Sequence, residues 1–201
     1  MPMENRSTSR FVALFWRLIA KLLVHPAVVD WLITRAQRTP YLHIMSADGA
    51  EMYMGRWWLF NPYSRETHKP ALWWCPWSVR VHHIMRPDED RDLHDHPWNA
   101  RTIILRGSYT EERLEPAGIA DMLKPGPLQW LQELDDLFKL SVRTRSPGDT
   151  ARLNHGEYHR IDEVSPGGVY TLFITSKWRG DWGFLVNGVK VPWRTYTETD
   201  N

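Results

Sequence analysis

The chain has 201 residues, of which 42% are apolar and 24% charged, and these values are ordinary for one soluble domain with a full hydrophobic core. Its 25 basic and 24 acidic residues nearly cancel, which argues against a general nucleic-acid binder, because such proteins gain much of their affinity by neutralising phosphates. The single cysteine excludes an internal disulfide and fits a reducing compartment, so we expect a cytoplasmic protein.

The first predicted element is an amphipathic helix from Arg10 to Val24. Its apolar residues recur at helical spacing and form one stripe, made of Phe11, Leu14, Phe15, Leu18, Ile19 and Leu22. We expect this stripe to be buried against the rest of the fold or against another subunit, which leaves a homodimer open; the alternative is a membrane surface. No apolar run reaches the roughly 20 residues of a spanning helix, so no membrane partner is expected. A second helix is predicted from Pro26 to about Arg38, because proline suits a first helical turn.

From about residue 50 the chain changes to short runs of aromatic and β-branched residues separated by turn residues, a pattern typical of an antiparallel sandwich or barrel. The predicted strands are Met52–Phe60, Ser78–Met85, Arg101–Leu105, Ser108–Glu112, Leu140–Arg145, Thr150–Leu153, Tyr158–Ile161, Val169–Thr175, Trp182–Leu185 and Val189–Pro192. Helical spacing of apolar residues from Pro127 to Phe138 predicts a short helical insertion. The predicted division is a helical extension over residues 1–49 and a β-barrel domain over residues 50–201.

Two histidines stand two residues apart in the segment Asp92-Leu93-His94-Asp95-His96-Pro97-Trp98. On an extended strand, residues i and i+2 point to the same face about 7 Å apart along the backbone, so both imidazoles can reach one metal ion. The pattern alone is weak because it also occurs by chance. A second segment strengthens it, since Gly148 is followed at short fixed offsets by Gly156 and His159.

Together, the two segments resemble the two motifs of the cupin superfamily. The matching positions are His94, His96, Gly107, Gly148, Gly156 and His159. The resemblance covers roughly residues 50 to 193. It implies an all-β fold, a cupin-type antiparallel jelly-roll β-barrel, that carries the two N-terminal α-helices and the short helical insertion. It also implies that the three histidines are ligands of a divalent metal ion.

The departures from the motifs bear on the metal. Ala100, followed by Arg101, stands where the first motif has an acidic residue, and in the second motif Asn154 and Glu163 replace the usual proline and asparagine. Without the carboxylate ligand, the site resembles the three-histidine site of the thiol dioxygenase branch, where iron is the usual metal. Iron is therefore the expected cofactor, with zinc, nickel and manganese as alternatives; imidazole alone suits several of these metals.

A second resemblance is to a group of uncharacterised cupin-like proteins common in phage genomes and found in bacteria. It is carried by the segments Arg80-Val81-His82-His83-Ile84, His94-Asp95-His96-Pro97-Trp98 and Trp182-Gly183-Phe184. This resemblance covers most of the chain and supplies no activity.

Other residues are candidates for roles around the metal. Arginine grips carboxylates with two donors, so an anionic substrate could be anchored by a set comprising Arg80, Arg101, Tyr109, Tyr158 and Arg160, of which Arg101, Tyr109 and Tyr158 are the catalytic candidates. Asp92 and Asp95 flank the ligands and either orient an imidazole or form turns. Trp98, Trp182 and Phe184 either wall a pocket or pack in the core. His82, His83 and His155 are interpreted as structural or exposed.

These features lead to a hypothesis of a metal-dependent enzyme, dioxygenase-like or isomerase/lyase-like, that acts on a small polar molecule. A three-histidine site leaves coordination positions for a substrate, which favours this hypothesis, whereas the lack of an obvious general base weakens it. The alternatives are a cupin that binds a small ligand or sugar without turnover, and a phage or host interaction protein.

Overall fold

The computed structural model describes residues 6–46, 49–116 and 138–199. Its helices are α1 (Arg6–Leu23), α2 (Pro26–Ala36) and α4 (Trp193–Thr199). Its strands are β1 (Ile44–Met45), β2 (Met52–Phe60), β3 (Ser78–Ile84), β4 (Ala100–Arg106), β5 (Tyr109–Pro116), β6 (Phe138–Arg145), β7 (Thr150–Leu153), β8 (His159–Val164), β9 (Val169–Thr175), β10 (Gly183–Val186) and β11 (Val189–Pro192). The predicted helical insertion lies outside the described residues, except that Phe138 begins β6.

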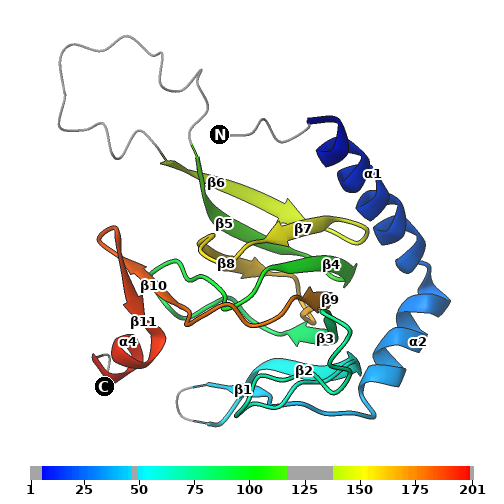
Figure 1. The fold of residues 1–201 in the computed structure, drawn as a ribbon, viewed down its shortest axis with the longest axis horizontal. Helices are drawn as coiled ribbons and strands as arrows, with labels where there is room; N and C mark the ends of the chain where they lie inside the picture. The colour runs from blue at the N-terminus through cyan, green and yellow to red at the C-terminus, as the bar shows by residue number, and fades with distance from the viewer. Residues whose placement is uncertain (1–5, 47–48, 117–137, 200–201) are drawn as a thin grey trace.

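The strands pair antiparallel in three sheets (Figure 1). A six-stranded sheet has the order β1-β2-β3-β9-β4-β7, a three-stranded sheet the order β6-β5-β8, and β10 and β11 form a hairpin. One core cluster joins the two larger sheets and consists of Ile84, Ile104, Tyr109, Ile161 and Val169. The predicted β-rich antiparallel architecture is confirmed. Pairing among the described strands does not close the sheets into a barrel, so the jelly-roll barrel stays a prediction.

Four predicted strands, at 52–60, 150–153, 169–175 and 189–192, have the observed bounds. The largest difference is at β5, which continues through polar residues to Pro116 because it pairs along its whole length with β6. Two short elements were not predicted: β1, which has two residues, and α4, which has neither an acidic first turn nor a basic last turn to mark it.

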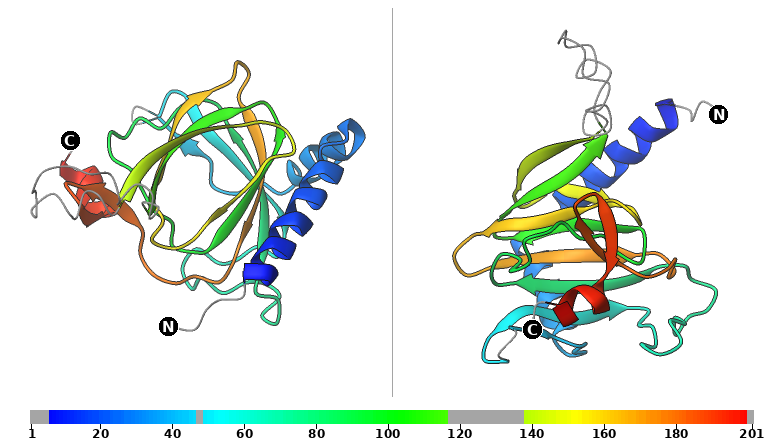
Figure 2. Two further views of the ribbon diagram at one scale, coloured as in Figure 1. Left: turned by 90° about the horizontal axis from the view of Figure 1, so that it is seen from above. Right: turned by 90° about the vertical axis from the view of Figure 1, so that its left-hand side faces the viewer.

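The two N-terminal helices pack against one face of the six-stranded sheet. Buried residues of α1 and α2 share one core cluster with β3, β4 and β9, and its members are Ala20, Val29, Leu32, Ile33, Ala36, Val81, Ile103, Leu105 and Leu172. Figure 2 shows both helices along one side of the sheets, with β10, β11 and α4 on the opposite side. The helical segment therefore completes the hydrophobic core of the sheet.

Of the stripe predicted on α1, only Ile19 is on the face that packs. Phe11, Leu18 and Leu22 are 71%, 57% and 70% exposed, whereas Ala20 is fully buried. The packed face contains Trp16, Ile19 and Leu23 beside Ala20, which are also at helical spacing. The prediction that the stripe packs against the sheets is therefore wrong within one chain, because α1 has two apolar faces and the small Ala20 lets the second one approach closely. Burial in another subunit stays a prediction.

Among the described residues, no single helix is long and apolar enough to cross a membrane. The pair Arg10–Leu23 and Pro26–Ala36 meets the length and composition criteria only when taken together, across a bend of 87°.

Candidate metal centre

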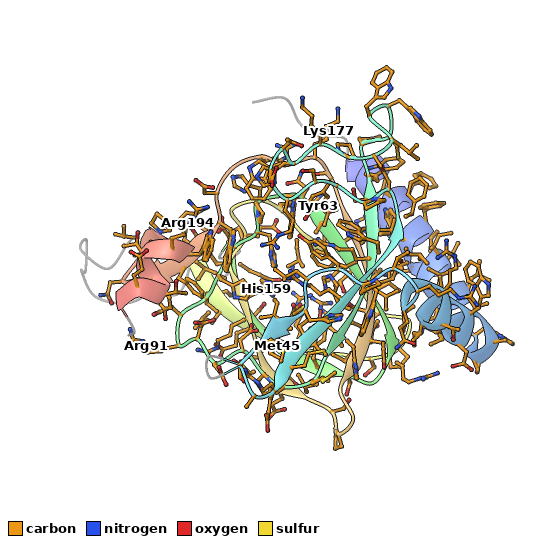
Figure 3. The ribbon with its side chains drawn as sticks, turned by 90° about the horizontal axis from the view of Figure 1, so that it is seen from below. Met45, Tyr63, Arg91, His159, Lys177 and Arg194 are labelled. Atoms are coloured by element: carbon orange, nitrogen blue, oxygen red, sulfur yellow. The ribbon has the colours of Figure 1, made fainter. Side chains whose placement is uncertain are left out.

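The three predicted ligands come together from two segments of the chain. His94 and His96 lie in the extended loop between β3 and β4, not in a strand as expected, and His159 is the first residue of β8. The backbone N–H groups of His94 and His159 each donate to the other's carbonyl at 2.9 Å. His94 also bridges to Phe184 of β10, so the loop is held between two strands. Figure 3 shows His159 near the centre of the molecule.

The imidazoles form one cluster. The candidate ligand atoms of His94, His96 and His159 all lie within 4.8 Å of one another. The Nε2 atoms of His96 and His159 are 2.9 Å apart. A shared proton would join these two nitrogens only to each other, whereas a cation can bind all three rings at once. The donor set therefore fits a metal ion that prefers nitrogen ligands.

The surroundings keep the rings of His94 and His96 neutral. Burial lowers the pKa of His94 to about 4, and the neighbouring imidazole of His159 adds to that effect against the attraction of Asp88. Burial likewise lowers the pKa of His96 well below its usual value, with repulsion from His159 and His94 in the same direction. A neutral imidazole is the form that binds a metal, so His94 and His96 do not have to lose a proton at neutral pH before they can do so.

Two buried carboxylates lie behind the imidazoles. Asp88 Oδ2 is 3.9 Å from His94 Nδ1 and accepts the backbone N–H of Ile161 at 2.8 Å. Glu111 Oε2 is 3.5 Å from His159 Nδ1, and its Oε1 accepts from Arg113 Nε at 2.8 Å and from Arg145 Nε. These contacts leave the Nε2 atom of each ring directed away from the carboxylates, which is the arrangement typical of metal-binding histidines.

Glu111 is ionised in spite of its burial. Burial alone would raise its pKa, but the contact with His159 and the charges of Arg113 and Arg145 outweigh it and hold the pKa at about 2. A fixed negative charge therefore stands beside His159, where it makes the ring a stronger electron donor.

The structure gives Asp92 and Asp95 other partners. Asp95 is fully buried and accepts the backbone N–H of Gly183 at 2.8 Å and Lys190 Nζ at 2.6 Å. Asp92 accepts the hydroxyl of Tyr196 at 3.0 Å. Both carboxylates thus tie the loop that carries His94 and His96 to the C-terminal hairpin and α4.

The three histidines line a cavity of about 800 Å³. Trp98, Trp182 and Phe184 form part of its wall, as one interpretation of the sequence predicted. Tyr109 also lines it, and burial raises the pKa of its hydroxyl, with Glu111 acting in the same direction, so the hydroxyl stays protonated.

Three other candidates lie away from this cavity. Arg101 points toward α1, with its guanidinium 4.8 Å from the ring of Trp16. Arg160 pairs with Glu112 and Asp162. Tyr158 is half-buried near Asp95, outside the cavity lining.

Sequence reasoning missed Asp88 and Glu111. Asp88 stands in an acidic run that reads as a turn, and no local signal separates it from its neighbours. Glu111 offered a weak signal, because alternation on β5 puts it on the same face as Tyr109. His82, interpreted as structural or exposed, lines the cavity, and its Nε2 is buried without a hydrogen-bond partner.

Comparison with known proteins gives low similarity. No family model and no curated protein matches the chain. An oxalate oxidase structure is 15% identical over 62% of this chain, with a TM-score of 0.39, and this chain spans 56% of its length. Oxalate decarboxylase from Bacillus subtilis is 8% identical over 81% of this chain and 32% of its own, with a TM-score of 0.44. A cupin-2 domain from Rhodospirillum rubrum is 11% identical over 73% of this chain and 74% of its own, with a TM-score of 0.42.

Proposed function

We propose that this chain is a cupin that binds one divalent metal ion on His94, His96 and His159 and acts on a small polar molecule in the adjoining cavity. The observation that carries the proposal is the convergence of three imidazoles whose ligand atoms lie within 4.8 Å of one another. The two matched motifs in the sequence support the family. The cavity supports a small ligand, because its volume of about 800 Å³ lies within the range of small-molecule sites.

Three groups of residues would have separate roles at the metal site. The imidazoles hold the ion, while Asp88 and Glu111 fix the rings of His94 and His159. A bound ion would act as a Lewis acid or as a redox centre, which are the two chemistries that dioxygenase-like and isomerase-like cupins divide between them. Trp98, Trp182 and Phe184 shield the site from solvent. By resemblance the ion is iron, with zinc, nickel or manganese as alternatives.

One observation favours the alternative of a cupin that binds a ligand without turnover. Both carboxylates beside the imidazoles already have donors, and the phenol of Tyr109 keeps its proton because its pKa is raised. None of these three groups is therefore an evident general base. A turnover assay with the metal-loaded protein separates the two functions.

Metal analysis tests the proposal. We expect the purified protein to carry about one equivalent of metal by elemental analysis and His96→Ala to lose it, because the substitution removes one of three ligands. His83→Ala is the matched control, since His83 lies on β3 with its ring stacked on Tyr170, outside the cluster. Equal trace metal in all three proteins would remove the metal site and the enzyme hypothesis with it.

A further inference from the structure

A buried arginine in the same cavity has no counter-ion. Arg80 on β3 is 1% exposed and lines the cavity. Its Nη1 donates to the hydroxyl of Tyr63 at 3.3 Å, while Nε and Nη2 are buried and have no hydrogen-bond partner. Among the described residues it forms no salt bridge. An arginine buried to this degree normally has a carboxylate beside it, because removing the charge from water costs several kcal/mol.

The two free nitrogens are the ones that bind a carboxylate best. Nε and Nη2 lie on one edge of the planar guanidinium, and their N–H groups are parallel, so together they match the two oxygens of a carboxylate. Both nitrogens are shielded from bulk solvent and have no hydrogen-bond partner among the described residues.

Aromatic rings around Arg80 explain part of its burial. Its Cζ lies 4.9 to 5.7 Å from the ring centroids of five side chains, namely Tyr41, Trp58, Tyr63, Trp98 and Phe173. The ring faces attract the cation, but they accept no hydrogen bond in the plane of the guanidinium, so the carboxylate-binding edge stays unsatisfied. The cage therefore stabilises the charge and leaves its directional donors for another group.

The cationic end of the cavity is next to the metal centre. Trp98 contacts both, with its ring centroid 4.9 Å from Arg80 Cζ and 5.5 Å from the imidazole of His96. Phe173 likewise lies 5.4 Å from Arg80 Cζ and 6.0 Å from His96. The indole Nε1 of Trp98 and the Nε2 of His82 are buried without partners as well, so unsatisfied polar atoms gather around these rings.

A second cation reinforces the charge at this end. Arg56 lines the cavity, donates from Nε to the carbonyl of Leu42 at 2.6 Å and forms no salt bridge among the described residues. The nearby acidic lining residue Glu66 is exposed to solvent and forms no ion pair with either arginine among the described residues. The cavity thus has imidazoles backed by carboxylates at one end and two uncompensated guanidinium groups at the other.

We propose that Arg80 binds the carboxylate of a small organic acid and that this acid is the substrate class of the metal centre. The second half of this statement rests on the proposed function. Carboxylate binding by Arg80 does not, because the guanidinium and its two free donors are present with or without a metal ion. Arg80 is then a substrate-binding residue, and the aromatic rings beside it suit an apolar body on the acid.

The test uses two acids and their neutral amides, benzoate with benzamide and succinate with succinamide, in calorimetric titrations of chelator-treated and zinc-loaded full-length protein. We expect at least one acid to bind the chelator-treated protein at least tenfold more tightly than its amide. Arg80→Met should abolish that preference, and Arg80→Lys should weaken it about tenfold because the parallel donors are lost. Arg101→Met is the matched control, an arginine of β4 stacked on Trp16 outside the cavity.

The stability of the same variants separates binding from a structural role. An uncompensated buried charge predicts that Arg80→Met unfolds at a urea midpoint equal to or above that of the unchanged protein. A clear fall in the midpoint would mean that the aromatic cage needs the cation, and would overturn the proposal, as would equal binding of acid and amide. Arg80-dependent acid binding in a protein that takes up no zinc would support the carboxylate subsite and refute the proposed function.

Discussion

At the scale of single residues, two carboxylates lie behind the imidazoles of the candidate metal site. Asp88 and Glu111 face the Nδ1 atoms of His94 and His159, and each is itself fixed by a hydrogen bond, from Ile161 N–H or from Arg113. Such outer partners commonly change metal affinity by 10- to 100-fold when they are removed. The structure therefore assigns to two acidic residues a role that motif matching cannot give.

Asp88→Asn tests this role. We expect metal affinity, measured by competition with a chelator, to fall by about tenfold or more, because the ring of His94 loses its negative partner. Asp92→Asn is the control from the same loop, since Asp92 contacts Tyr196 and Arg91 and no imidazole in the described structure. An equal loss in both variants, or no loss in Asp88→Asn, would contradict the assignment.

The sequence predicted the three histidines because their spacing is local and their two segments match known motifs. It did not predict Asp88 or Glu111, and it named Arg80 only as one of five candidate anchors for an anion, because the importance of these residues comes from contacts across the fold. Asp88 meets His94 only because the loop folds back toward β8, and Arg80 is isolated from carboxylates only because aromatic side chains from β2, β9 and the loops surround it. One-dimensional patterns contain no information on such neighbours.

At the scale of elements, the hairpin of β10 and β11 closes one side of the cavity. Trp182 and Phe184, at the start of the hairpin, line the cavity. Asp95, in the loop that carries His94 and His96, holds the hairpin by accepting hydrogen bonds from Gly183 N–H and Lys190 Nζ. The ion pair is asymmetric, because the carboxylate is fully buried while the lysine side chain is 35% exposed. Loss of the lysine thus leaves a buried charge with one donor fewer.

Lys190→Met should accordingly lower the free energy of unfolding by about 1–3 kcal/mol in urea titrations, the cost of a buried polar group left without a partner. Lys177→Met, at an exposed position without a salt bridge among the described residues, should change it by less than about 0.5 kcal/mol. If Lys190→Met is as stable as that control, the hairpin is not held by this contact.

The packing of α1 gives a second test at this scale. Ala20 is fully buried in the shared core, so Ala20→Leu should overpack it and lower the free energy of unfolding by about 1–3 kcal/mol. Leu18→Ala, on the exposed stripe, should cost less than about 0.5 kcal/mol at low protein concentration. A larger loss of stability for Leu18→Ala would mean that the stripe is packed after all, as the sequence pattern predicted.

The sequence predicted the bounds of helices and strands better than it predicted which of their faces pack together. Strands such as β2, β7, β9 and β11 begin and end at turn residues, so their bounds follow from local chemistry. The packed face of α1 does not, because phenylalanine and leucine give the stronger stripe while the fit around Ala20 depends on the surface of β3, β4 and β9. Hydrophobic pattern alone could not choose between the two faces.

At the scale of the whole molecule, two sheets and the C-terminal hairpin surround one cavity with two chemically different ends. One end holds imidazoles backed by carboxylates, and the other holds Arg80 and Arg56, which have no counter-ion in the part of the chain that the structure describes. The arrangement suits a molecule whose anionic group and metal-facing group are separated by an apolar body. The central claim, on which the enzyme hypothesis depends, is that the first end is a metal site.

A crystal structure of the zinc-loaded protein, with anomalous data collected at the zinc edge, tests this claim most directly. We expect one strong peak in the cavity, about 2.0–2.1 Å from a ring nitrogen of each of His94, His96 and His159. A map without a peak between these rings, or with a peak bound by fewer than three of them, would contradict it.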